Sequence, residues 1–319
     1  MLAANDDIFI GIEIGGTKLQ LVTGDRFGAI KERIRYSINP QEGAPGIQNQ
    51  IKEGIEKLLL ENKVKAIGVG FGGPVDWKTG AIQLSHQIEG WGNFNLKTWL
   101  QELLGLPVAI DNDANTAALA EAIHGCGKDY NTVFYMTIGS GIGGGMVINQ
   151  RIYHGRTPGE VEIGHIRLDK NGSTIESRCS GWAVNKKVRE HIATHPESRL
   201  AQLSKNSNAP EAYLLTPALA EKDGDAITIL NEVADDISFG LSHVVHLFNP
   251  EIIIIGGGLS LLKDHLRLPI IEKLPDYLLK ALLPAPTIVT ASLVEDVVPV
   301  GALELAKEAA QLYKKSINT

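Results

Sequence analysis

The stretch Val108–Glu121, VAIDNDANTAALAE, decides the fold, because it predicts where a buried strand ends and a helix begins. Val108-Ala109-Ile110 is an apolar strand end, and the alanine, leucine and glutamate content after it favours a helix. Two carboxylates and two amides lie between them. Backbone N–H groups and the helix dipole favour an ionised aspartate there, which can take a proton from a substrate hydroxyl. Plain helix capping by Asp111 and Asn112 is an equal alternative from this stretch alone.

The composition sets bounds on the class of protein. A chain of 319 residues favours two domains, since single cores rarely grow past roughly 250–300 residues. A net charge of -7 and a pI of about 5.7 argue against a nucleic-acid surface. The two cysteines, Cys126 and Cys179, build neither a disulfide framework nor a four-cysteine zinc site. No signal peptide or membrane span is predicted, so we expect a cytoplasmic protein with no membrane partner.

A glycine-rich hairpin occurs once in each half of the chain. Ile8–Ile14 alternates into Gly15-Gly16-Thr17-Lys18 and a second apolar run, which predicts a β-hairpin with a tight glycine turn. Val133–Ile138 repeats the pattern ahead of the glycine-rich run Gly139–Gly145. Glycines this dense let the backbone approach an anion, and Thr137 and Ser140 add hydroxyls. Two such turns with a carboxylate between them predict a cleft that binds nucleotide phosphates from both sides.

Two familiar phosphate motifs are rejected. Gly11–Lys18 nearly matches a P-loop, but Thr17-Lys18 reverses the required order and a strand pattern follows. The spacing of Gly68, Gly70 and Gly73 fits a dinucleotide fingerprint, yet Pro74 follows at once and no helix begins there.

The order of these motifs resembles the ROK (repressor, open reading frame, kinase) sugar kinases of the actin-like ATPase superfamily. The resemblance runs from about Ile8 to Leu305. Its motifs are Ile14–Lys18, Gly72–Asp76, Asn112–Asn115, Thr137–Gly145, Glu162–His165, Asn249–Glu251 with Ile255–Gly258, and Val300–Ala302. Each motif alone is weak, whereas their order and spacing together are specific.

The resemblance implies a fold and a set of roles. The expected fold is α/β, with two actin-like (ribonuclease-H-like) lobes formed by residues 1–113 plus 301–319 and by residues 114–300. Asp113 would be the catalytic base. Sugar binding would fall to Gly73, Asn112, Glu162, His165 and Glu176, a mixture of donors and acceptors that suits a polyol. ATP would be held by Gly15, Gly16, Thr17, Lys18, Thr137, Gly139, Ser140, Gly141 and Gly143, with Gly256, Gly257 and Gly258 at the nucleoside end. For His165 the plain alternative is an ordinary, partly buried histidine.

Two departures from the family pattern concern metals. The first phosphate turn of the family usually carries aspartate where this chain has Glu13, whose longer arm can still help hold hydrated Mg²⁺. Most members also follow the Gly-His pair with a cysteine-rich zinc loop. Here the segment after His165 is short and carries one cysteine, Cys179, so we predict that zinc is absent. We expect packing of the shortened loop, helped by Trp182, to orient His165 instead.

The expected activity is transfer of the ATP γ-phosphoryl group to a hexose, with glucose and its 6-hydroxyl as first choice. The expected assembly is a homodimer. An N-acetylhexosamine is an alternative acceptor, because acceptor choice depends on the loops around Gly73, Gln87 and Glu176. Polyphosphate as donor would call for a basic track that this composition does not indicate. A sugar-sensing regulator would need a helix-turn-helix ahead of Ile8, and only seven residues precede it here.

Overall fold

The computed structural model describes residues 7–317 apart from 84, 86–87 and 157. It divides into two compact units. The first comprises Met1–Asp129, Gly145–Glu160 and Leu293–Thr319, and the second comprises Tyr130–Gly144 and Val161–Ser292. No helix among the described residues is long and apolar enough to cross a membrane.

The first unit is built on a five-stranded sheet with the order β3-β2-β1-β4-β7. Its strands are β1 (Ile8–Ile14), β2 (Lys18–Asp25), β3 (Ile30–Ser37), β4 (Val64–Phe71) and β7 (Val108–Asn112). The first three form an antiparallel meander, whereas β4 and β7 run parallel to β1. A small hairpin, β5 (Val75–Asp76) with β6 (Ala81–Ile82), follows β4.

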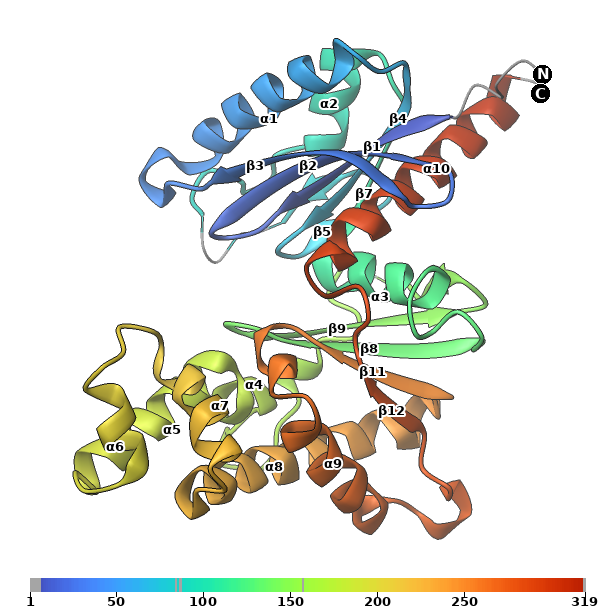
Figure 1. Cartoon of the computed structure of the whole chain (residues 1–319). Helices are drawn as coiled ribbons and strands as arrows, with labels where there is room; N and C mark the ends of the chain where they lie inside the picture. The colour runs from blue at the N-terminus through green and yellow to red at the C-terminus, as the bar shows by residue number, and fades with distance from the viewer. Residues whose placement is uncertain (1–6, 84, 86–87, 157, 318–319) are drawn as a thin grey trace, which may run out of the picture. The chain divides into compact units, whose positions relative to one another are not determined.

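Helices cover both faces of this sheet (Figure 1). They are α1 (Gly43–Leu59) and α2 (Leu96–Leu104) on one face and α10 (Val297–Ile317) on the other, with α3 (Asp113–Ile123) following β7. The period-2 alternation of β1 separates the two cores: Ile10, Ile12 and Ile14 pack with α1 and α2, whereas Phe9 packs with α10.

Glycines let α10 approach the sheet closely. A Cβ on Gly68 would lie 1.8 Å from the Ala302 carbonyl oxygen, and one on Gly70 would lie 2.5 Å from Val298 Cγ1. These are two of the three glycines of the rejected dinucleotide pattern, so their role is helix–sheet packing. On α10 itself, a Cβ on Gly301 would fall 2.0 Å from the Thr116 carbonyl oxygen of α3. This packing places α3 in the first compact unit, whereas the predicted lobes divide the chain after Asp113.

The second unit contains the parallel strands β8, β11 and β12, in a sheet of order β10-β9-β8-β11-β12. The strands of this sheet are β8 (Thr132–Ile138), β9 (Ile142–Ile148), β10 (Arg151–Ile152), β11 (Ile252–Gly256) and β12 (Thr287–Thr290). The helices are α4 (Ile175–Cys179), α5 (Gly181–Thr194), α6 (Arg199–Ser204), α7 (Leu215–Ala220), α8 (Gly224–Phe248) and α9 (Asp264–Lys273). The short 3-10 turns of this unit are η2 (Ile163–His165), η3 (Glu211–Leu214), η4 (Gly258–Leu262), η5 (Leu274–Tyr277) and η6 (Lys280–Leu282), whereas η1 (Pro40–Glu42) and η7 (Val294–Asp296) belong to the first unit.

Candidate functional site

Three turns of the first unit lie side by side because their strands end in register. Ile14 of β1 pairs with Phe71 of β4, and Phe71 pairs with Asn112 of β7. All three strands are parallel, so their carboxyl ends meet at one edge, where ligands of open α/β sheets bind. The residues that follow are Gly15, Gly72 and Asp113, and Gly72 N–H donates to the Ile14 carbonyl at 2.8 Å. The sheet therefore brings the first glycine turn, the Gly72-Gly73 turn and the predicted base together.

Asn112 caps α3 and contacts the Gly72-Gly73 turn as well. Its Oδ1 accepts from Ala114 N at 2.8 Å and from Asn115 N at 3.3 Å, while its Nδ2 donates to the Gly73 carbonyl at 3.2 Å. The capping alternative is thus right for Asn112, and the capping side chain also fixes the loop that carries Gly73.

Asp113 is the first residue of α3 and does not serve as its cap. Its Oδ1 accepts from Ala114 N at 2.8 Å, and its Oδ2 lies 3.5 Å from where a Cβ on Gly72 would stand. The carboxylate therefore faces a turn that has no side chain at Gly72, and it lies at the first turn of the helix, where the helix dipole favours negative charge.

Glu13, the predicted magnesium contact, has a partner on each oxygen. Oε1 lies 3.3 Å from Lys18 Nζ, and Oε2 accepts from Gln20 Nε2 at 2.6 Å. Burial raises the pKa of this carboxyl above its ordinary value, against the opposing effect of the Lys18 charge. Because both oxygens of Glu13 already have partners, this carboxylate is better suited to contact a water of hydrated Mg²⁺ than to bind the ion directly. Mg²⁺ keeps several of its waters in protein sites.

The second glycine turn is tied to two helices of the second unit. The turn lies between β8 and β9, and Gly181 N–H at the start of α5 donates to the Gly139 carbonyl at 2.8 Å. Glu176 of α4 accepts from Ile142 N at 2.7 Å, and a Cβ on Gly141 would fall 2.5 Å from its carboxylate. The predicted sugar contact Glu176 therefore also supports the turn predicted to bind phosphate.

The third glycine segment follows β11, next to the second. Gly256 pairs with Thr137 in the parallel ladder of β11 and β8. Gly257 has φ 80° and ψ 178°, and a Cβ on it would lie 2.6 Å from backbone atoms of Ile138. Thr137, the Gly139 turn and Gly256–Gly258 are thus neighbours at the carboxyl ends of adjacent parallel strands, as the predicted nucleotide set requires.

Glu162 and His165 lie at the two ends of η2 and are both exposed. The residue before them, Val161, has φ 59°, a left-handed conformation that is rare for a β-branched side chain and marks local strain. The His165 ring makes no hydrogen bond to any described residue. Gln87, named with Gly73 and Glu176 as a determinant of the acceptor, lies outside the described residues.

The segment that replaces a zinc loop closes on itself as a hairpin. Leu168 N–H donates to the Ser173 carbonyl at 2.8 Å, and Ile175 N–H donates to the Ile166 carbonyl at 3.1 Å. Asp169 Oδ1 accepts from Asn171 N within the turn at 2.6 Å. Trp182 is 67% exposed, so most of its side chain lies outside any packing against this segment. The hairpin's own hydrogen bonds hold the segment.

Cys179 is unsuited to bind a metal. Its side chain is fully buried, its Sγ lies 3.7 Å from the Val233 carbonyl oxygen, and burial raises the pKa of the thiol to about 12. A metal ligand must be a thiolate. Among the described residues, one group of three side chains has ligand atoms in reach of a single ion, and it is Asp111, His154 and Glu160, without His165. The absence of zinc at His165 stays a prediction.

We expect the purified protein to carry substoichiometric zinc and to keep its melting temperature in phenanthroline. Chelators loosen proteins whose folding energy includes a metal, whereas backbone hydrogen bonds close this hairpin. Elemental analysis and thermal melts with and without chelator measure both quantities. One zinc per chain, with stability lost on chelation, would contradict the prediction.

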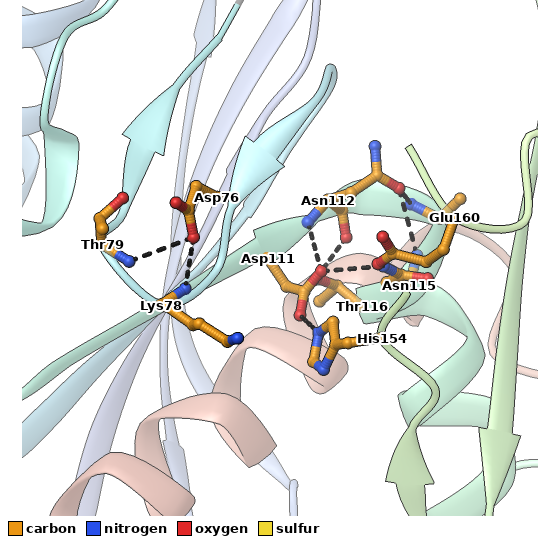
Figure 2. Close-up of polar contacts among 10 residues, drawn as sticks. Asp76, Lys78, Thr79, Asp111, Asn112, Asn115, Thr116, His154 and Glu160 are labelled. Carbon is orange, nitrogen blue, oxygen red and sulfur yellow. Dashed lines mark hydrogen bonds and ion pairs between the residues drawn. The ribbon is translucent and has the colours of Figure 1, made fainter. Parts of the chain in front are cut away.

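Behind the strand-to-helix turn lies a polar cluster that sequence reasoning missed (Figure 2). His154 Nε2 lies 2.6 Å from Asp111 Oδ2, and Asn115 Nδ2 donates to both Asp111 Oδ1 (3.0 Å) and Glu160 Oε1 (2.9 Å). The sequence predicts Asp111 as one of two candidate carboxylates or as a helix cap, and in the structure Asn112 is the cap of α3. The sequence signal for this cluster is the polar side chain of Asp111 at the end of an apolar strand. That signal does not indicate which distant residue is its partner.

The chain matches known proteins over nearly its whole length. A family model described as "ROK family" matches residues 9–309. A glucokinase of Halalkalibacterium halodurans is 30% identical over 329 residues, covering 99% of both chains. The structure of a ROK family glucokinase from Streptomyces griseus, in complex with glucose and AMPPNP, superposes with a TM-score of 0.82 at 30% identity, covering 94% of this chain and 99% of that one. A ROK family transcriptional regulator has a TM-score of 0.87 at 22% identity, covering 98% of this chain and 81% of that one, which shows the fold alone. These neighbours confirm the predicted actin-like α/β fold.

Proposed function

The chain belongs to the ROK family, and we propose that it is a kinase that transfers the γ-phosphoryl group of ATP to the 6-hydroxyl of glucose. The observation that carries this proposal is the in-register ending of β1, β4 and β7. It lines up a glycine turn suited to phosphate, a loop held by Asn112, and the carboxylate of Asp113. The glucokinase relatives, one of them solved with glucose and AMPPNP, support the same substrates.

Asp113 takes the central step in the proposed mechanism. Its carboxylate accepts the proton of the sugar hydroxyl while that oxygen forms a bond to the γ-phosphorus. The bond between the γ-phosphorus and the bridging oxygen breaks, and ADP leaves with the bonding electron pair. Phosphoryl transfer needs little covalent help from a protein, so positioning and charge neutralisation supply most of the catalysis.

The remaining residues bind and orient the substrates. In the first unit, Gly73 and Asn112 hold the sugar, and the turn Gly15–Lys18 holds phosphate through backbone N–H groups and the Lys18 ammonium. In the second unit, Glu162, His165 and Glu176 are the sugar set, and the turn after Thr137 with Gly256–Gly258 is the nucleotide set. Mg²⁺ bound with ATP neutralises phosphate charge, and Glu13 would hold one of its waters. The homodimer and the cytoplasmic location stay predictions.

A coupled ADP-release assay tests the proposal. We expect the highest kcat/KM with glucose, ATP and Mg²⁺, and little turnover without Mg²⁺. Mannose, N-acetylglucosamine and N-acetylmannosamine as acceptors, and polyphosphate as donor, decide between this proposal and its alternatives within the same family. Binding of glucose by calorimetry, with no turnover under any of these conditions, would contradict a kinase and favour a sugar-sensing regulator.

A further inference from the structure

The buried carboxylate of Asp111 organises the backbone that carries Asn112 and Asp113. Asp111 is 3% exposed. Its Oδ1 accepts from the backbone N–H of Asn112 at 2.8 Å and from Asn115 Nδ2 at 3.0 Å. Its Oδ2 has one partner among the described residues, His154 Nε2 at 2.6 Å. The orientation of this carboxylate therefore depends on His154, and so does the turn that it holds (Figure 2).

The ring of His154 also packs against the ring of Trp77. The two rings stack with centroids 4.1 Å apart and planes 15° apart. Trp77 lies in the turn of the β5–β6 hairpin, where Asp76 Oδ1 accepts from the backbone N–H groups of Lys78 and Thr79 at 3.0 and 3.3 Å. This hairpin directly follows Gly72-Gly73-Pro74. The imidazole thus lies between the loop predicted to hold the sugar and the turn that carries the predicted base.

We propose that His154 is a positioning residue, which joins the Gly73 loop through Trp77 to Asp111 and so fixes the placement of Asn112 and Asp113. The proposal rests on the proposed function. Loss of the imidazole leaves Asp111 Oδ2 buried without a donor, and the carboxylate must then rotate or draw in water. Either change disturbs its bonds to Asn112 N and Asn115. Because a displacement of about 1 Å in a reacting group can cost roughly 10²-fold in rate, a small shift matters here.

A hydrogen bond between His154 and Asp111 explains the close approach of these side chains better than a bound metal cation does. Asp111, His154 and Glu160 have ligand atoms within 4.8 Å of one another. However, two ligands that each stand about 2.1 Å from one ion lie roughly 3 Å apart, whereas His154 Nε2 and Asp111 Oδ2 lie 2.6 Å apart, in direct hydrogen-bond contact. Glu160 Oε1 also already accepts from Asn115 Nδ2 at 2.9 Å.

The chain offers a matched control for the test. His124 Nε2 lies 2.8 Å from Glu304 Oε1, and this half-buried histidine with a buried glutamate lies at the far end of α3 from Asp113. His124→Ala therefore removes the same ring from a second histidine–carboxylate pair, in which Lys307 Nζ also contacts Glu304, without touching the strand-to-helix turn. His154→Gln is the conservative variant, since its amide can still donate to Asp111 Oδ2.

We expect His154→Ala to lower kcat for glucose phosphorylation by about 10–100-fold while KM for ATP stays within about twofold. His154→Gln should recover most of the lost kcat. His124→Ala should lose thermal stability, as His154→Ala does, and keep its kcat. Hydrogen exchange of the amides at residues 112–116, read by mass spectrometry, should accelerate in His154→Ala and not in His124→Ala.

Exchange of these amides is measured without substrate, so it separates this proposal from the kinase proposal. If the wild-type protein phosphorylates no sugar while exchange still changes as expected, the kinase proposal fails and the positioning role stands. Unchanged exchange with unchanged kcat in His154→Ala would overturn the positioning role. So would a rise in melting temperature with Zn²⁺ or Mn²⁺ that His154→Ala abolishes, because the cluster would then be a metal site.

Discussion

Asp113→Asn is expected to lower kcat by about 10²–10⁴-fold, the usual cost of removing a positioned general base. Glucose affinity should stay within a few-fold of wild type, because the amide keeps the size of the side chain and an oxygen that can accept from Ala114 N. The fold should also persist, since Asn112 and not Asp113 caps α3. Steady-state kinetics and calorimetry with glucose measure the two effects separately.

Asp25→Asn is the matched control for this charge change. Asp25 lies in the same unit and accepts from the backbone N–H groups of Phe27 and Ala29 in the turn after β2, at 2.9 and 3.2 Å. It therefore shares with Asp113 a carboxylate bound to backbone amides, but it lies outside the proposed site. We expect its kcat to be unchanged. Near-normal kcat in Asp113→Asn would show that Asp113 is structural and that another group accepts the proton.

Local pattern was enough to predict the elements that carry the site. Period-2 alternation and glycine turns predicted the hairpins at Gly15-Gly16 and Gly139–Gly145, and the structure has both. The change from apolar strand to helix-forming residues near Asp113 placed the turn correctly. In each of these cases the signal and the structure lie within about ten residues of each other in the sequence.

Long-range partners could not be predicted in the same way. His154 is 43 positions from Asp111, and nothing in its neighbours indicates a buried carboxylate. The role of Gly68 and Gly70 could not be predicted for the same reason. These glycines are needed because α10, more than 200 residues later in the chain, packs closely on them. The closing of the segment after His165 as a hairpin likewise depends on backbone bonds that a missing cysteine pattern does not reveal.

The second large effect is expected from Gly257→Ala, which should destabilise the second unit by about 2–6 kcal/mol. Gly257 has φ 80° and ψ 178°, a region essentially confined to glycine, and a side chain there costs about 1–3 kcal/mol. The added Cβ would also stand 2.6 Å from backbone atoms of Ile138, the last residue of β8. Overpacking of this kind costs about 1–3 kcal/mol more, because a central strand cannot move aside.

The adjacent Gly258→Ala separates this strain from nucleotide binding. Gly258 begins η4, is exposed, lacks a positive φ, and would place a Cβ with no atom within 4 Å. Its melting temperature should therefore match wild type, whereas Gly257→Ala should melt about 10 °C lower. A rise in KM for ATP in the folded Gly258→Ala protein would then mean that the added methyl group contacts the nucleotide. That result would place the nucleoside beside this segment. Equal melting temperatures for the two variants would show that the chain after β11 adapts freely, and that Gly257 does not hold the end of β8 and the glycine turn that follows it.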